Sequence, residues 1–327
     1  MTMLVDIRLT LAYLAEQPII HTEETLGNIS KIKKMRVMVG GKPVPVPALS
    51  GNSFRGQLRD VLADRMFEVL SNNGQQHITF NNNEIYGAVY SGGALREESR
   101  LAGTMHTLKD AVPMIRLMGA AFGNVMLPSK LAVTHIVPCA EETRSILASA
   151  LSELGDGILS PVAEWPKAHD LIFNDGPLTR KDDRRDPARQ RFVDLGPVPE
   201  DEHAQHQQMI YYVECIPSGT WLLHQLYSKY SLDELELGCL FDGLTTWLGA
   251  PTLGGRSAAG YGQVRAHVRG KVGDEAIRWP EHPEWPEAIK QALSKYRAYL
   301  DQKRADLLTA LQAEAKEGQD DQVEGDA

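Results

Sequence analysis

The sequence predicts an α+β fold in which a core of alternating strands and helices carries large insertions. Three observations support this class. Segments with strand periodicity are interspersed with segments whose apolar residues recur at helical spacing. Glycine and proline cluster between these segments, as is typical of turns. A hydrophobic fraction of 43% in 327 residues is sufficient for a full-sized core without metal ions or disulfide bonds.

The first expected elements are a strand, a hairpin and a helix. Residues 5–11 alternate between apolar and polar or small side chains, which predicts a strand with one buried face. Residues 35–39 and 44–46 flank Gly40-Gly41 and predict a hairpin, whose proline-rich second arm belongs at a sheet edge. Apolar residues at helical spacing predict a helix from about residue 50 to residue 70.

The remaining elements complete the core. They are a strand at 131–137, a helix at 141–154, paired strands at 209–215 and 221–226, a helix at 232–248 and a last strand at 261–268. The core order is therefore strand, helix, strand, strand, helix, strand. This split βαβ order is that of ferredoxin-like and RRM-like domains, and we expect it to span residues 1–270.

Other regions do not fit the split βαβ pattern. We expect a helical insertion at about 60–130 and a second insertion at 155–207, which is rich in proline and has little periodicity. A C-terminal helical extension at 271–316 contains an amphipathic helix from about residue 286, which packs on its own domain or docks on a neighbouring subunit. Residues 317–327 have the composition of an acidic, disordered tail.

Charge is unevenly distributed along the chain. The formal net charge is −9, but six acids and one base between residues 314 and 327 contribute −5 of it. Residues 25–59 contain seven bases and no acid, residues 251–272 contain four bases and no acid, and residues 179–191 contain six bases and three acids. Each basic segment by itself is consistent with solvated surface, whereas the three together favour a polyanionic partner.

The sequence also constrains compartment and cofactors. The three cysteines are far apart, which fits neither a disulfide framework nor a zinc site and indicates a reducing compartment. The N-terminal segment lacks the apolar run of a signal peptide, and no stretch has the length of a membrane span. We therefore expect a cytoplasmic protein without a metal site or a cofactor.

A first functional motif lies at residues 47–59, where small capping residues precede a helix whose first turns carry two arginines. The free N–H groups of a helix N-terminus attract anions, and Arg55 and Arg59 can bind phosphate oxygens. The alternative is that Ser50 or Asn52 caps the helix and has no further role. We favour contact with phosphate.

A second motif lies at residues 253–264, where four glycines and Arg256 separate a helix from a strand. Glycine permits positive φ and close backbone approach, so successive N–H groups can form a concave anion site. A dinucleotide-binding fingerprint is excluded, because there the glycines follow a strand and precede a helix. The alternative is an ordinary turn.

These two motifs, together with Leu117–Gly123 and Val213–Thr220, resemble those of the RAMP superfamily of CRISPR effector proteins. The resemblance spans about residues 5–268 and depends on four motifs in one order. In length and layout the chain is most similar to the backbone subunit, copies of which polymerise along the guide RNA. The implied partners are guide RNA, target nucleic acid, further copies of the chain head to tail and other effector subunits, without a membrane.

By this resemblance, the helix start and the glycine loop lie near the guide RNA, and the insertion at 155–207 forms a thumb hairpin that reaches a neighbouring copy. An unstructured surface loop is the alternative for the insertion. The predicted RNA contacts are Lys31, Lys33, Lys34, Ser50, Asn52, Ser53, Arg55, Arg59, Arg180, Lys181, Gly254, Gly255, Arg256 and Ser257.

Residues 26–30 resemble the I-G-G-I-D loop of type III backbone proteins, whose aspartate is needed for target-RNA cleavage. Ser30 occupies the position of that aspartate and does not recruit a metal ion as a carboxylate does. We therefore expect a subunit that does not cut RNA, most similar to the type IV backbone protein. Glu23 or Glu24 is the alternative carboxylate. His21 is the candidate general base if the chain is instead an endoribonuclease that processes guide RNA.

Overall fold

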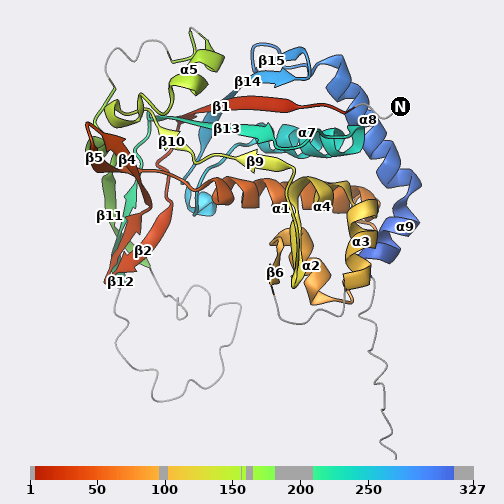
Figure 1. Ribbon diagram of the computed structural model, residues 1–327. Coiled ribbons are helices and arrows are strands. Elements are labelled where there is room, and N and C mark those ends of the chain that lie inside the picture. The colour runs from red at the N-terminus through yellow and green to blue at the C-terminus, as the bar shows by residue number, and fades with distance from the viewer. Residues whose placement is uncertain (1–3, 96–101, 156, 160–164, 181–208, 313–327) are drawn as a thin grey trace, which may run out of the picture.

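The computed structural model describes residues 4–95, 102–155, 157–159, 165–180 and 209–312. It has a mixed α+β fold, as the sequence predicts (Figure 1). The three cysteines are buried and free. None of the helices in the described part of the chain combines the length and apolar character that crossing a membrane requires.

The largest sheet contains six strands, all paired antiparallel. They are β1 (Ile7–Ala15), β9 (Leu131–Val133), β10 (Val137–Pro138), β13 (Trp221–Ser228), β14 (Val264–Val272) and β15 (Glu275–Trp279). The spatial order is β10-β13-β1-β14-β15, and β9 also pairs with β13. Along the chain these strands alternate with α1 (Gly51–Leu70) and α7 (Glu234–Gly249), an arrangement compatible with a split βαβ core.

The main core lies between this sheet and the helices α1 and α7. Leu9 and Leu11 of β1 are fully buried there, together with Phe54 of α1 and Phe241 of α7. On the opposite face of the sheet, α5 (Ala148–Leu154) packs against β1, β13 and β14, and Figure 1 shows α1 and α5 on opposite sides of β1. We call this opposite face the outer face.

A second group of strands projects to one side of the core, and we call it the β-lobe (Figure 1). Its four-stranded sheet has the order β11-β12-β3-β2. The strands are β11 (Phe173–Arg180), β12 (Met209–Cys215), β3 (Ile29–Ile32) and β2 (Thr22–Leu26), accompanied by the hairpin of β4 (Lys34–Val39) and β5 (Lys42–Pro47). Strands β12 and β3 run parallel, which brings residues more than 180 positions apart into contact.

Short elements surround these two parts. Between α1 and the β9 strand lie α2 (Asn83–Tyr90), α3 (Ala102–Ala111), α4 (Pro113–Met118) and the small sheet of β6 (Gly93–Leu95), β7 (Ala120–Gly123) and β8 (Val125–Leu127). Single 3-10 turns are η1 (Glu141–Thr143), η2 (Ala168–Leu171) and η4 (Ser257–Ala259). The helices α8 (Glu287–Gln302) and α9 (Arg304–Leu311) complete the described chain.

Several local predictions are confirmed. The hairpin around Gly40-Gly41 is present as β4 and β5. Helix α1 begins after Ser50, whose hydroxyl accepts from the backbone N–H of Ser53, and it ends where Asn72 and Asn73 adopt positive φ. The predicted amphipathic C-terminal helix packs on its own chain, against α7, but it is divided at Lys303 into α8 and α9.

Other predictions are wrong in the pairing of a strand or in the bounds of an element. Residues 209–215 and 221–226 are both strands, but they do not pair with each other, because the connection crosses from the β-lobe to the main sheet. The predicted helix at 141–154 is reduced to η1 and α5. The last predicted strand begins at Val264 and is followed by β15, which the sequence analysis missed.

Candidate nucleic-acid interface

The N-terminus of α1 is closely capped. His21 Nε2 accepts from the backbone N–H of Ser50 at 3.2 Å, and His135 Nδ1 accepts from that of Gly51 at 3.1 Å. A Cβ atom at Gly51 would lie 2.6 Å from the carbonyl oxygen of Val133, which explains the glycine. Two imidazoles and the Ser50 hydroxyl thus satisfy N–H groups that the sequence analysis assigned to a phosphate, and Asn52 is left with an exposed side chain.

The two arginines of α1 differ in environment. Arg59 is 5% exposed, and its guanidinium donates to the carbonyl oxygens of Ala88 at 3.0 Å, Met118 at 3.1 Å and Gly119 at 2.7 Å. Burial lowers its pKa to about 10, so it stays charged at neutral pH. Arg59 therefore supports the fold, because its donors face backbone carbonyls, and its contact with RNA stays a prediction.

Arg55 is more accessible. Its guanidinium also donates to the carbonyl of Met118, but the side chain is only half-buried and lines a groove of about 830 Å³. Burial lowers its pKa, and its Nε has no hydrogen-bond partner in the described part of the chain. The same groove, which we call the α1 groove, is lined by Asn52 and Lys229. It can accept an anionic or polar ligand beside the helix start.

The glycine loop lies directly against the first motif. Gln57 Nε2 of α1 donates to the carbonyl of Gly254 at 3.0 Å, across 197 positions of sequence. Gly254 has φ +77°, and a Cβ atom there would lie 2.1 Å from the carbonyl oxygen of Ile20. Gly255 pairs with Ile20 through a 2.9 Å backbone hydrogen bond. The two motifs predicted separately from the sequence therefore form one surface.

The loop also connects the core to the β-lobe. Arg256 adopts a left-handed conformation with φ +61°, which is uncommon for a residue other than glycine, and its guanidinium lies 5.1 Å from the centre of the Tyr211 ring. The Tyr261 hydroxyl donates to the Asp175 carboxylate of β11. Arg256 and Ser257 are exposed, so the tip of the loop presents a cation to solvent.

The lysines of the β-lobe are largely paired with carboxylates. Lys31 Nζ lies 2.8 Å from Glu214 Oε1, Lys34 Nζ lies 3.9 Å from Glu214 Oε2, and Lys33 Nζ lies 2.9 Å from Glu23 Oε1. Burial by itself would raise the pKa of Glu214, but hydrogen bonds from Lys31 and the Ile32 N–H, with the charge of Lys34, hold it below the usual value. The basic segment is therefore partly neutralised.

Glu214 is the residue of this surface that the sequence analysis did not single out. It was part of the matched Val213–Thr220 motif, but nothing in its local sequence indicates that it faces the lysines. The parallel pairing of β12 with β3 brings it there. By contrast, no carboxylate is paired with Arg55 or Arg256 among the ion pairs of the described residues.

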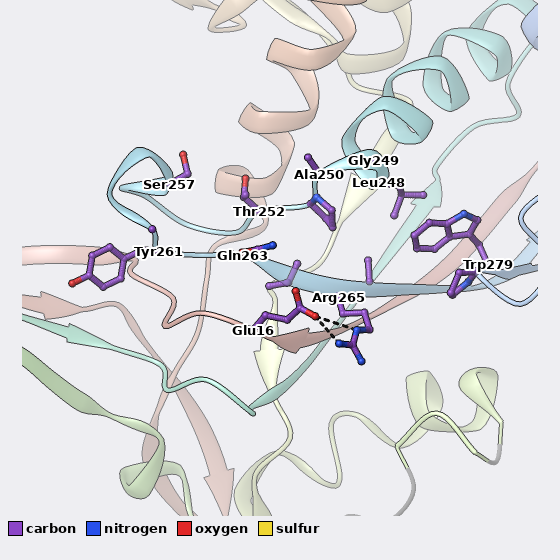
Figure 2. A pocket seen from close by; sticks show the side chains of 15 residues that line it. Glu16, Leu248, Gly249, Ala250, Thr252, Ser257, Tyr261, Gln263, Arg265 and Trp279 are labelled. Carbon is purple, nitrogen blue, oxygen red and sulfur yellow. Dashed lines mark hydrogen bonds and ion pairs between the residues drawn. The ribbon is translucent and has the colours of Figure 1, made fainter.

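A second cavity, of about 450 Å³, adjoins the glycine loop (Figure 2). Apolar side chains that include Leu248 and Trp279 form part of its wall, and Ser257 and Tyr261 of the loop line it as well. At its margin, Arg265 Nη2 and Nε donate to Glu16 Oε1 at 2.7 and 3.1 Å. The glycine loop thus separates the α1 surface from a largely apolar cavity.

The residues considered for catalysis lie in the β-lobe. Ser30 is buried, with its Oγ 3.5 Å from that of Thr25, while Glu24 is exposed on β2 opposite Lys31. Burial and the charge of Lys33 lower the pKa of His21, whose Nε2 lone pair is already used as an acceptor. Within the described ranges, no three His, Cys, Asp or Glu side chains gather as a metal site.

The predicted thumb is only partly described. Arg180 is the last residue of β11, where it pairs with Met209 of β12. Lys181 lies outside the described residues. The contact predictions for this pair therefore remain predictions.

Comparison with known proteins identifies the fold. No protein-family model and no curated protein matches the sequence. Among solved structures, a chain of a type IV-B CRISPR complex is 20% identical, with a TM-score of 0.50, and the match covers 86% of this chain and 96% of that chain. Csc2 from Thermofilum pendens is 14% identical, with a TM-score of 0.38, covering 94% and 80%. The protein therefore shares the fold of the type IV-B chain, as the motif resemblance implies.

Proposed function

We propose that this protein is the multicopy backbone subunit of a CRISPR ribonucleoprotein and that it holds the guide RNA by its phosphates, with the bases free for pairing. The observation that carries the proposal is the convergence of the α1 start and the glycine loop at the Gln57–Gly254 hydrogen bond. The shared fold with the type IV-B chain, over nearly the whole of that chain, supports it.

The phosphate contacts are assigned to the exposed and half-buried cations of this surface. Arg256 at the loop tip, Arg55 in the α1 groove and Lys34 of β4 lie around the two motifs, and Asn52 adds an uncharged donor. None of these groups selects a base by its position, so target sequence is read by base pairing with the guide. Binding of this kind releases counterions and weakens steeply as salt rises.

We further propose that the subunit does not cleave RNA. Serine at position 30 supplies no carboxylate to hold a metal ion, and Glu23 is engaged by Lys33. The rival function, processing of guide RNA with His21 as a general base, is disfavoured because its Nε2 accepts the Ser50 N–H. Specific cleavage of repeat RNA that is lost in His21→Ala would establish the rival instead.

Assembly along the RNA follows if neighbouring copies contact each other through two different surfaces. A β-lobe that contacts the core of the next copy makes a head-to-tail interface, and a repeated head-to-tail interface that does not close produces an open helical filament. The partners of the subunit are then guide RNA, target nucleic acid, further copies of itself and other effector subunits.

Co-expression with a repeat array tests the proposal directly. Wild-type protein should elute as a large particle with a 260/280 nm absorbance ratio above that of free protein. Arg256→Ala should lower the ratio, because it removes the exposed cation of the loop. Lys109→Ala, which removes an exposed cation on α3, is the matched control and should leave the ratio unchanged. Wild-type protein that elutes free of nucleic acid and does not bind added RNA would contradict the proposal.

A further inference from the structure

A second row of cations lies on the outer face of the main sheet, opposite α1, and its first member, Arg265, adjoins the cavity beside the glycine loop. Along β14, the buried residues Val264, Ala266 and Val268 alternate with Arg265, His267 and Arg269. Side chains at alternate positions of a strand point to the same face, so the basic set lies opposite the main core. Lys271 continues this set toward the end of the strand.

Neighbouring strands extend the row. Arg8 of β1 is directly opposite Lys271, and Arg278 of β15 is directly opposite Arg269. Residues directly opposite each other in an antiparallel pair share a face. The row therefore comprises Arg8, Arg265, His267, Arg269, Lys271 and Arg278, and we call it the outer row.

Carboxylates neutralise the positive charge of the outer row only in part. Arg265 pairs with Glu16 at 2.7 Å and Arg8 with Glu153 at 3.6 Å. Arg269, which is mostly buried, pairs with Glu281 at 2.7 Å. Five permanent cations thus face three carboxylates.

The cations that exceed the carboxylates in number are accessible to a ligand. Lys271 and Arg278 are exposed, and neither has a carboxylate partner among the residues that the structure describes. Arg8 and Arg265 keep 62% of their side-chain surface exposed despite their ion pairs.

The outer row also has aromatic neighbours and a cavity. The rings of Trp221 and His267 lie 5.8 Å apart, and both line a cavity of about 410 Å³ together with Arg265, Arg269 and the carboxylate Glu281. Cations beside aromatic rings are a combination by which proteins hold single-stranded nucleic acid. Residues two apart on a strand are separated by about 6.7 Å, which is close to the separation of successive phosphates in an extended nucleic-acid strand.

We propose that the outer row binds a single strand of nucleic acid, separately from the guide-RNA surface. The strand runs along β14, with phosphates against Arg265, Lys271 and Arg278 and a base against the Trp221–His267 pair. The sheet lies between this surface and α1, so occupation of one does not block the other. This inference does not depend on the proposed function, since it concerns a different face.

Fluorescence anisotropy with a labelled oligouridylate, without complementarity to any loaded guide, tests the inference on the full-length protein. Lys271→Ala combined with Arg278→Ala should weaken binding about tenfold and reduce the slope of log affinity against log salt by about 1.4, or about 0.7 per lost contact. The matched control is Lys109→Ala combined with Lys167→Ala, which removes two exposed cations elsewhere and should bind as the wild type does.

The outcomes separate this inference from the proposed function. RNA that co-purifies should be retained by the Lys271→Ala, Arg278→Ala variant and reduced in Arg256→Ala. If no RNA co-purifies with the wild type, the proposed function fails while the oligouridylate titration still reports on the outer row. Equal affinity of the outer-row variant and the wild type overturns the inference. A change in assembly mass with unchanged affinity also overturns it, in favour of a contact between protein copies.

Discussion

Burial separates the roles of two arginines that are four residues apart on one helix. Both line the α1 groove, but Arg59 is buried and donates to carbonyls at the ends of α2 and α4, whereas Arg55 is half-buried and donates to the carbonyl of Met118. Local sequence does not distinguish them, because each follows a buried apolar residue, Phe54 or Leu58, and precedes a small or polar one. Their different environments lead to different expected effects of substitution.

Arg59→Ala should lower the free energy of unfolding by about 3 kcal/mol, since several buried carbonyls lose their donor and each unsatisfied group costs about 1–3 kcal/mol. Arg55→Ala should cost about 1 kcal/mol, because it loses one hydrogen bond at a half-buried site. Urea denaturation of both variants measures the difference. Equal losses would show that Arg59 is not the structural member of the pair.

His224 should make the fold sensitive to acid. Its Nε2 lies 2.9 Å from the Tyr13 hydroxyl, and complete burial lowers its pKa from 6.5 to about 3. The unfolded state therefore binds a proton more readily, so the contribution to stability is fully present above pH 6.5 and is lost as the pH falls toward 3. The limiting slope is about 1.4 kcal/mol per pH unit. Urea titrations measure the free energy of unfolding at pH 7 and pH 4.5. The loss of this free energy between the two pH values should be smaller for His224→Gln than for the wild type. An identical loss would contradict this assignment.

At the scale of elements, the glycine loop depends on close backbone contact. Gly254 and Gly262 both have positive φ, and a Cβ atom at either position would lie within 2.2 Å of a carbonyl oxygen. Gly255 differs, because a Cβ atom there would meet nothing within 4 Å. The adjacent glycines 254 and 255 therefore provide a matched pair of positions.

Gly254→Ala should displace the loop from Ile20 and Gln57 and weaken guide-RNA binding, whereas Gly255→Ala should retain wild-type binding. Electrophoretic mobility shift with repeat RNA measures both, and thermal unfolding shows whether the fold is retained. If both variants bind as the wild type does, the close approach of Gly254 has no part in RNA binding.

The pairing of β12 with β3 leads to a variant that should bind RNA more tightly than the wild type. Glu214→Gln should tighten RNA binding and steepen the salt dependence by about 0.7, because Lys31 is released to a further phosphate. Lys34, already assigned to a phosphate, loses a competing carboxylate. The Gln side chain can still accept from the Ile32 N–H, so little stability should be lost. Glu141→Gln, on η1, changes the net charge equally and is the control. Weaker binding by Glu214→Gln would indicate that Glu214 orients the lysines for RNA.

At the scale of the whole molecule, net charge is a poor guide to the surface. The chain has a formal net charge of −9, yet cations gather around the glycine loop and again on the outer face of the sheet. Since the Debye length at physiological salt is about 8 Å, a phosphate responds to the charges of the face it meets more than to the total. A protein with an acidic average can therefore bind RNA.

Filament length should follow RNA length. Light scattering of particles assembled on guide RNAs of increasing length should give a mass that rises stepwise, because each copy covers a fixed number of nucleotides and the interface does not close. A constant mass, independent of RNA length, would indicate a closed ring or a discrete oligomer instead.

Much of the fold followed from the sequence by itself. The α+β class, the β4–β5 hairpin, helix α1 and the amphipathic C-terminal segment were predictable because periodicity, capping residues and turn residues act over a few positions. That the helix start and the glycine loop contact one ligand was also a prediction from the sequence. The partner of β12 was not predictable, because strand pairing joins residues far apart in the chain.

Only the tertiary structure decided which charges are free. It turns Arg59 into the core, places Glu214 between Lys31 and Lys34, and aligns Arg8, Lys271 and Arg278 on the outer face. A residue's type gives its charge, but its effect on a ligand depends on the groups that surround it after folding. Those groups come from distant segments whose packing no local pattern specifies.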